Sequence, residues 1–102
     1  MAISPDISVA MCTYNGADYI VEQLESMAAQ TLLPAEIVVS DDGSTDGTIA
    51  LLKQTWERLT SRFPELSKVK LTILVNKTSL GVTANFEQAI AATSKKYVFL
   101  AD

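Results

Sequence analysis

Acidic and polar side chains stand in this sequence directly after short apolar runs. Asp41 and Asp42 follow the run EIVV with one serine between, Thr13 and Tyr14 follow ISVAMC, and Asp102 follows YVFLA. Two adjacent carboxylates repel each other, and at the end of a strand their side chains diverge. One can then face a ligand, such as the N–H edge of a nucleotide base, while the other bonds the backbone. The alternative for Asp41-Asp42-Gly43-Ser44 is a turn followed by a helix cap, because these residues are common turn formers.

Other polar or aromatic positions could take part in the same chemistry. Tyr14 could stack on a base through its aromatic face, or it could be a half-buried tyrosine in a turn. Asn85 could contact a phosphate or a ribose, or it could be a surface amide. Cys12 is most simply a small apolar residue of a strand. Asp102 suits a hard cation such as Mg²⁺ or Mn²⁺, although one carboxylate does not make a metal site.

The apolar patterns predict strands that alternate with helices. Strands are predicted at Ile7–Thr13, Glu36–Ser40, Lys70–Val75 and Tyr97–Ala101, and helices at Ala17–Gln30, Thr48–Arg62 and Thr83–Thr93. The resulting order, βαβαβαβ, predicts a Rossmann-like parallel sheet in a three-layer α/β/α sandwich. We expect the first strand between the second and the fourth, with the third outside the second. The polar strand ends would then meet at one edge, where open α/β sheets bind ligands.

Composition excludes several classes of function. The formal net charge of −4 argues against a nucleic-acid partner, because a phosphate backbone attracts a basic surface. The absence of histidine removes a Ser/His or Cys/His catalytic pair, and the single cysteine excludes an intrachain disulfide. No apolar run approaches the roughly 20 residues of a membrane helix, and no signal peptide is visible. We therefore expect a cytoplasmic protein.

The motifs together resemble a known family. The segment ISVAMCTYNGADYIVEQLESMAAQT, then EIVVSDDGSTDGT, SLGVTANFEQAI and YVFLAD, is similar in order and spacing to the inverting family 2 glycosyltransferases of GT-A fold. The similarity runs from Ile7 to Asp102, and the segment ANFEQAI particularly resembles a rhamnosyltransferase-like branch. It implies transfer of a sugar from a nucleoside-diphosphate sugar, of UDP or dTDP type, to an acceptor hydroxyl. It also implies a role in polysaccharide biosynthesis for the cell envelope.

The resemblance also implies roles for individual residues. Cys12, Thr13 and Tyr14 would contact the base, and Asp42 would bond the pyrimidine, which leaves Asp41 a structural role. Asn85 would belong to the nucleotide site, and Asp102 would be the first acid of a DxD motif that binds ribose and a Mg²⁺ or Mn²⁺ ion. One departure is Ala84, where many members carry a basic residue.

The same resemblance implies what this chain leaves out. Residues 1–102 would be the donor-binding, N-terminal part of a larger domain, truncated at the acidic motif, with the general base and acceptor site beyond Asp102. No catalytic residue is then expected here, and the full protein could lie at the inner face of the membrane. The fourth strand would be a bare edge able to form a homodimer. The alternative function is a non-catalytic nucleotide-binding α/β module.

Overall fold

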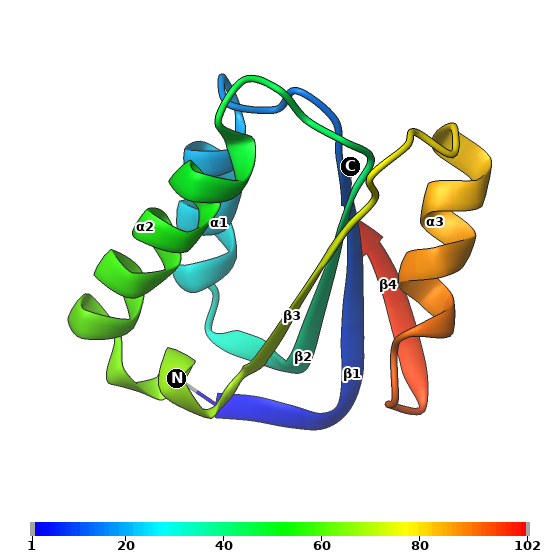
Figure 1. Cartoon of the computed structure of the whole chain (residues 1–102). Coiled ribbons are helices and arrows are strands. Elements are labelled where there is room, and N and C mark those ends of the chain that lie inside the picture. The colour runs from blue at the N-terminus through cyan, green and yellow to red at the C-terminus, as the bar shows by residue number, and fades with distance from the viewer. Residues whose placement is uncertain (1, 102) are drawn as a thin grey trace.

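The protein, seen in a computed structural model that describes residues 2–101, is a parallel sheet with helices on both faces (Figure 1). All strand pairs are parallel and the sheet order is β3-β2-β1-β4, as the sequence predicts. The elements, in chain order, are β1 (Ala2–Thr13), α1 (Ile20–Ala28), β2 (Leu32–Asp41), α2 (Thr48–Arg62), the 3-10 helix η1 (Pro64–Lys68), β3 (Lys70–Val75), α3 (Val82–Ala91) and β4 (Tyr97–Ala101). The three-layer α/β/α arrangement is therefore confirmed.

The two faces of the sheet carry separate apolar cores. Alternate residues of the central strands, such as Met11 and Val39, pack against α1 and α2 on one face. Residues of the opposite parity, such as Ala10 and Val38, pack against Ala89 of α3 on the other. The period of two along a strand explains this division, because successive side chains point to opposite faces. Figure 1 shows α1 and α2 together on one side of the sheet and α3 alone on the other.

Two strands begin earlier than predicted. β1 starts at Ala2 and β2 at Leu32, and their pairing is irregular between Ser4, which lies opposite Pro34, and Ser8, which lies opposite Glu36. Proline has no N–H to give to a ladder, so within sheets it is tolerated at edges and irregularities such as this one. The residues before the irregularity lack the apolar runs that mark the rest of each strand.

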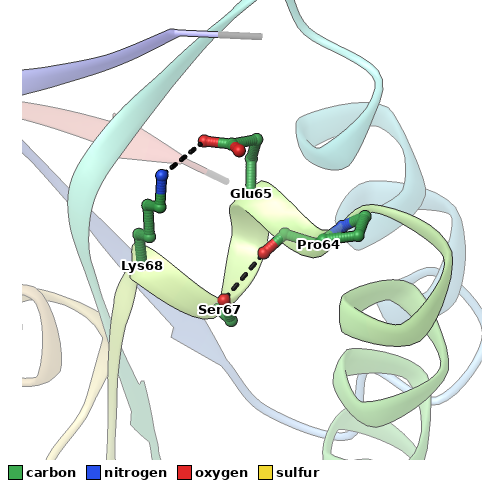
Figure 2. A network of polar contacts seen from close by, with 4 residues as sticks. All are labelled: Pro64, Glu65, Ser67 and Lys68. Atoms are coloured by element: carbon green, nitrogen blue, oxygen red, sulfur yellow. Dashed lines mark hydrogen bonds and ion pairs between the residues drawn. The ribbon is translucent and has the colours of Figure 1, made fainter.

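The helices differ from the prediction mainly at their ends. α1 and α3 are shorter than predicted, whereas the predicted bounds of α2 hold. The short helix η1 was not predicted. In it the Ser67 hydroxyl donates to the Pro64 carbonyl oxygen at 2.7 Å, and Lys68 pairs with Glu65 at 3.3 Å (Figure 2). This ion pair is exposed and contributes little stability.

A buried carboxylate fixes the loop that leads into β4. Glu36 is 1% exposed, and its Oε1 accepts hydrogen bonds from Ser8 Oγ at 2.7 Å and from the Ser94 amide at 2.8 Å. Burial opposes the charged form, but these hydrogen bonds and the charge of Lys70 outweigh it, so the pKa of Glu36 lies below its ordinary value. The start of β4 is thereby tied to β1 and β2.

Candidate functional site

The polar strand ends meet at one edge of the sheet. Thr13 lies level with Asp41, and Asp41 lies level with Val75, the residue before Asn76. The carboxyl ends of these strands point to the top of Figure 1, where the loops after β1, β2 and β3 converge. The predicted juxtaposition of Thr13 and Asp42 at one edge is therefore observed, since the Asp42 amide donates to the Thr13 carbonyl at 2.9 Å. Asp102 lies outside the described residues.

Asp41 and Asp42 have separate environments. Asp41 is fully buried, and its carboxylate accepts from Thr13 Oγ1 at 2.6 Å, from Ser44 Oγ at 2.6 Å and from the Ser44 amide at 2.8 Å. These bonds join the end of β1 to the turn after β2. Asp41 is thus a structural residue, and the Thr13 hydroxyl is engaged by it.

Asp42 accepts hydrogen bonds from the loop between β3 and α3, which lies on the side of β2 opposite to β1. Its Oδ1 accepts from the Leu80 amide at 2.7 Å and from Asn76 Nδ2 at 3.0 Å, and its Oδ2 accepts from the Gly81 amide at 3.1 Å. The bond from Leu80, followed by that from Asn76, holds the pKa of Asp42 below its ordinary value. The carboxylate is therefore ionised and acts only as an acceptor at neutral pH.

Asp42 lines a cavity of about 230 Å³ that opens at this edge. The lining combines polar groups with aromatic and apolar side chains: Cys12, Thr13, Tyr14, Tyr19, Asp42, Val82, Asn85 and Phe86. Tyr14 is 58% exposed and Tyr19 is 39% exposed, so both rings are accessible. All five residues predicted for the nucleotide site within the described part of the chain line this one cavity. Their binding roles remain predictions.

Three lining residues were not predicted from the sequence: Tyr19, Val82 and Phe86. The ring of Tyr19 lies against Gly16, because a Cβ on Gly16 would lie 2.5 Å from Tyr19 Cζ. A larger residue at position 16 would therefore require the ring to move. A glycine just ahead of a tyrosine at the start of a helix could have marked Tyr19, whereas Phe86 shows in the sequence only as part of a helical apolar stripe.

The loops after β1 and β2 are joined by hydrogen bonds beside the cavity. Asn15 has a left-handed backbone conformation, with φ of 49°. Its backbone N–H donates to Ser44 Oγ at 2.8 Å, and its side-chain Oδ1 accepts from the backbone N–H of Thr45 at 2.8 Å. The Asp46 carboxylate accepts from the Ala17 amide at 3.1 Å and also bonds the Thr48 hydroxyl. These bonds hold the segment that carries Tyr14 against the turn that follows β2.

Two predicted binding residues are constrained by their surroundings. Burial, together with the negative charge of Asp42, raises the pKa of the Cys12 thiol to about 11, so Cys12 is a neutral thiol at physiological pH. Asn85 is 2% exposed, and its amide bonds Ser40 at 2.6 and 2.9 Å and Asn76 at 3.1 Å. Asn85 therefore lies in the wall of the cavity with its polar atoms already paired.

A larger cavity of about 480 Å³ lies near the Gln30–Pro34 segment at the beginning of β2. Its lining, which includes Val9 and Phe99, contains no charged side chain. The cavity at the strand ends is smaller but carries the convergent polar groups that fix a ligand's orientation. We therefore assign the candidate site to the smaller cavity.

The described residues do not form a metal centre by themselves. Within residues 2–101, no group of three or more His, Cys, Asp or Glu side chains is arranged to hold a metal ion. In the same part of the chain, no helix has the length and apolar character needed to cross a membrane.

Comparison with known proteins decides the family. The sequence model of the family described as "Glycosyl transferase family 2" matches residues 8–102, which is nearly the whole chain. The chain belongs to glycosyl transferase family 2. This membership confirms the resemblance inferred from the motifs.

Relatives of this family 2 chain are much longer than it is. An uncharacterized glycosyltransferase of Haemophilus influenzae is 35% identical over 95 residues, which cover 91% of this chain and 26% of the relative. An uncharacterized protein of Mycobacterium tuberculosis is 32% identical over 97 residues, which cover 94% and 26%. The chain thus spans about a quarter of the length of these relatives.

A solved structure shows the same fold. The mannosyltransferase PcManGT from Pyrobaculum calidifontis, in complex with GDP-Man and Mn²⁺, matches with a TM-score of 0.72 and 27% identity. The match covers 92% of this family 2 chain and 26% of PcManGT. The family 2 assignment therefore holds for the fold as well as for the sequence.

Proposed function

We propose that residues 1–102 bind the nucleotide of a nucleoside-diphosphate sugar, as the N-terminal part of a longer transferase. The observation that carries this proposal is the cavity lined by Asp42, Tyr14 and Tyr19 at the carboxyl ends of the strands. Its volume of about 230 Å³ is below the roughly 300–1,000 Å³ of pockets for drug-sized ligands. It suits one part of such a ligand, and aromatic walls suit the flat face of a base.

The hydrogen bonds of Asp42 support a uracil or thymine base. A carboxylate has about four acceptor positions, two on each oxygen. Oδ1 already accepts two hydrogen bonds and Oδ2 accepts one, which leaves one position for a ligand. Uracil and thymine each offer a single N–H between two carbonyl groups, whereas guanine offers two adjacent donor groups. Asp42 thus favours UDP or dTDP over the guanosine nucleotide that PcManGT holds.

Within this proposal the other lining residues have distinct roles. Tyr14 stacks on the base, and the neutral Cys12 together with Thr13 packs at its edge. Asn85 closes the cavity wall from α3. One N–H of Asn85 Nδ2 donates to the Ser40 carbonyl oxygen, so a direct contact with a phosphate would use the second N–H of the same group.

We further propose a divalent cation, Mg²⁺ or Mn²⁺, as cofactor of the longer protein, with Asp102 as an oxygen ligand from this chain. The support is the Mn²⁺ in PcManGT and the preference of hard cations for oxygen. Such an ion would neutralise charge on the diphosphate leaving group. Because the described residues lack a metal cluster, we expect UDP binding by residues 1–102 to be weak and insensitive to Mn²⁺. Calorimetry with and without Mn²⁺ tests this, and metal-dependent micromolar binding would contradict it.

The activity of the longer protein follows from the family and is part of the same proposal. We infer transfer of a sugar, rhamnose or another hexose, to an acceptor hydroxyl, with inversion and with a carboxylate base outside residues 1–102. The setting would be polysaccharide biosynthesis for the cell envelope, at the cytoplasmic face of the membrane. Accordingly we expect neither sugar transfer nor donor hydrolysis by residues 1–102 alone.

Nucleotide titrations followed by NMR test the donor-binding proposal. We expect UDP and dTDP to shift the backbone signals of residues around the cavity, and CDP and ADP, whose ring edges lack the imide N–H, to do so more weakly. Shifts that cluster elsewhere, or equal affinity for all four nucleotides, would refute the assigned site. UDP binding by residues 1–102, with no transfer by a longer form that includes the acidic continuation, would favour a non-catalytic binding module.

A further inference from the structure

A network of side-chain amides lies behind the Asp42 carboxylate and connects it to α3. Asn76, the first residue after β3, is the centre of this network. Its Nδ2 donates to Asp42 Oδ1 at 3.0 Å and to Asn85 Oδ1 at 3.1 Å, and its Oδ1 accepts from Gln88 Nε2 at 2.7 Å. Each polar atom of the Asn76 amide is therefore paired.

The directions of these bonds allow only one orientation of the Asn76 amide. Nδ2 faces two oxygen atoms, which accept, and Oδ1 faces an amide nitrogen, which donates. A flip of the amide would place oxygen against oxygen at Asp42 and nitrogen against nitrogen at Gln88. Gln88 is itself held, because its Nε2 also donates to Ser40 Oγ at 2.9 Å.

The same loop supplies the other donors to Asp42. The backbone amides of Leu80 and Gly81 reach the carboxylate at 2.7 and 3.1 Å, and Ser79 Oγ donates to the Asp42 carbonyl oxygen at 2.6 Å. The backbone of Asn76 also anchors the start of this loop, because its backbone N–H donates to the Asp41 carbonyl oxygen at 2.9 Å. Residues 76–81 therefore wrap around Asp42 from one end of the loop to the other.

We propose that Asn76 is the positioning residue of the nucleotide site, holding the Asp42 carboxylate so that a single acceptor position on Oδ2 is left for the base. This inference rests on the proposed nucleotide binding. Asn76 is absent from the cavity lining, so it would not touch the ligand. Its effect on binding passes through Asp42, and through the α3 residues Asn85 and Gln88.

The test removes the Asn76 amide and observes Asp42 directly. The Asp42 side-chain carboxyl is titrated by ¹³C NMR in the wild type, in Asn76→Ala and in Gln54→Ala, which removes an exposed amide from α2 as a matched control. We expect the pKa of Asp42 to rise toward its ordinary value in Asn76→Ala and to stay unchanged in Gln54→Ala. Asn76→Ser, which keeps a short donor, provides a milder variant if Asn76→Ala does not fold.

UDP titrations of the same variants separate this inference from the proposed function. Loss of one net hydrogen bond predicts about 2- to 12-fold weaker UDP binding in Asn76→Ala, and a smaller preference for UDP over GDP, because a position on Oδ1 is freed. An unchanged pKa of Asp42 and an unchanged UDP:GDP ratio in folded Asn76 variants would overturn the positioning role. If Asp42→Ala also binds UDP as the wild type does, the nucleotide site itself is wrong.

Discussion

The Thr13 hydroxyl donates a 2.6 Å hydrogen bond to Asp41 Oδ1, linking the ends of two neighbouring parallel strands. Both side chains are buried, and the Asp41 carboxylate also accepts hydrogen bonds from Ser44 in the following turn. The carboxylate of Asp41 therefore has a structural role, whereas Asp42, the second acid of the pair, lines the cavity.

Asp41 is expected to matter for stability more than for nucleotide selectivity. Asp41→Ala leaves the buried Thr13 hydroxyl and the Ser44 amide without a partner, which should cost about 1–3 kcal/mol of unfolding free energy. Asp41→Asn should cost less, because an amide oxygen can still accept. Urea denaturation measures the loss. An Asp41→Asn protein as stable as the wild type, but with an altered preference among nucleotides, would reverse the roles assigned to the two acids.

Cys12 should react slowly with alkylating agents. Its pKa of about 11, compared with 9.0 for an unperturbed thiol, lowers the thiolate fraction at neutral pH. After allowance for the greater nucleophilicity of a more basic thiolate, we expect iodoacetamide to react about tenfold more slowly with native than with urea-unfolded protein. The native rate should still be rising above pH 10. Asp42→Asn should shift this profile to lower pH, and equal native and unfolded rates at pH 7 would contradict the raised pKa.

The buried carboxylate of Glu36 should make stability depend on acid pH. Because the pKa of Glu36 is lowered in the folded protein, its stabilising effect is present above the unfolded value, about 4.3, and is lost as pH falls through the folded value. The thermal midpoint of the wild type should therefore fall below about pH 4. Glu36→Gln, which keeps the acceptor for Ser8 and Ser94 but has no charge, should show a flatter dependence over that range. Parallel profiles for the two proteins would show that Glu36 does not contribute.

The free edge of β4 should support self-association. β4 is a terminal strand of the sheet, and Tyr97, Phe99 and Leu100 are each more than half exposed on it. Unprotected edges invite pairing with another chain. We expect light scattering to show concentration-dependent dimers that Leu100→Lys abolishes, whereas Val75→Lys on the opposite edge leaves them intact. A wild-type protein that stays monomeric at every concentration, or equal effects of both variants, would exclude this interface.

Much of the fold could be predicted because local patterns and global topology agree. The runs Lys70–Val75 and Tyr97–Ala101 are short, apolar and bounded by polar or turn residues, and both strands have the predicted bounds. Polar residues after each run also indicated the edge at which a site would form. By contrast, η1 has no apolar periodicity that would mark it, and the irregular pairing near Pro34 depends on contacts between strands.

The details of the site were less predictable, because they depend on side chains that meet only after folding. Asn76 and Asp42 are 34 residues apart, and nothing in either segment specifies that one donates to the other. The ring of Tyr19, which lines the cavity, lies against Gly16, and this contact forms only in the folded chain. The sequence indicated which strand ends carry the site, whereas the partners of each polar atom required the structure.

Recognition of the base by Asp42 can be tested by comparing the UDP affinities of Asp42→Ala and Asp41→Asn with that of the wild type. Loss of a buried acceptor predicts about 5- to 150-fold weaker binding in Asp42→Ala. Asp41→Asn should retain nearly wild-type affinity in its folded fraction. NMR titration of the folded proteins supplies both values, even where binding is weak. Equal UDP affinity in wild type and folded Asp42→Ala would show that Asp42 does not recognise the base.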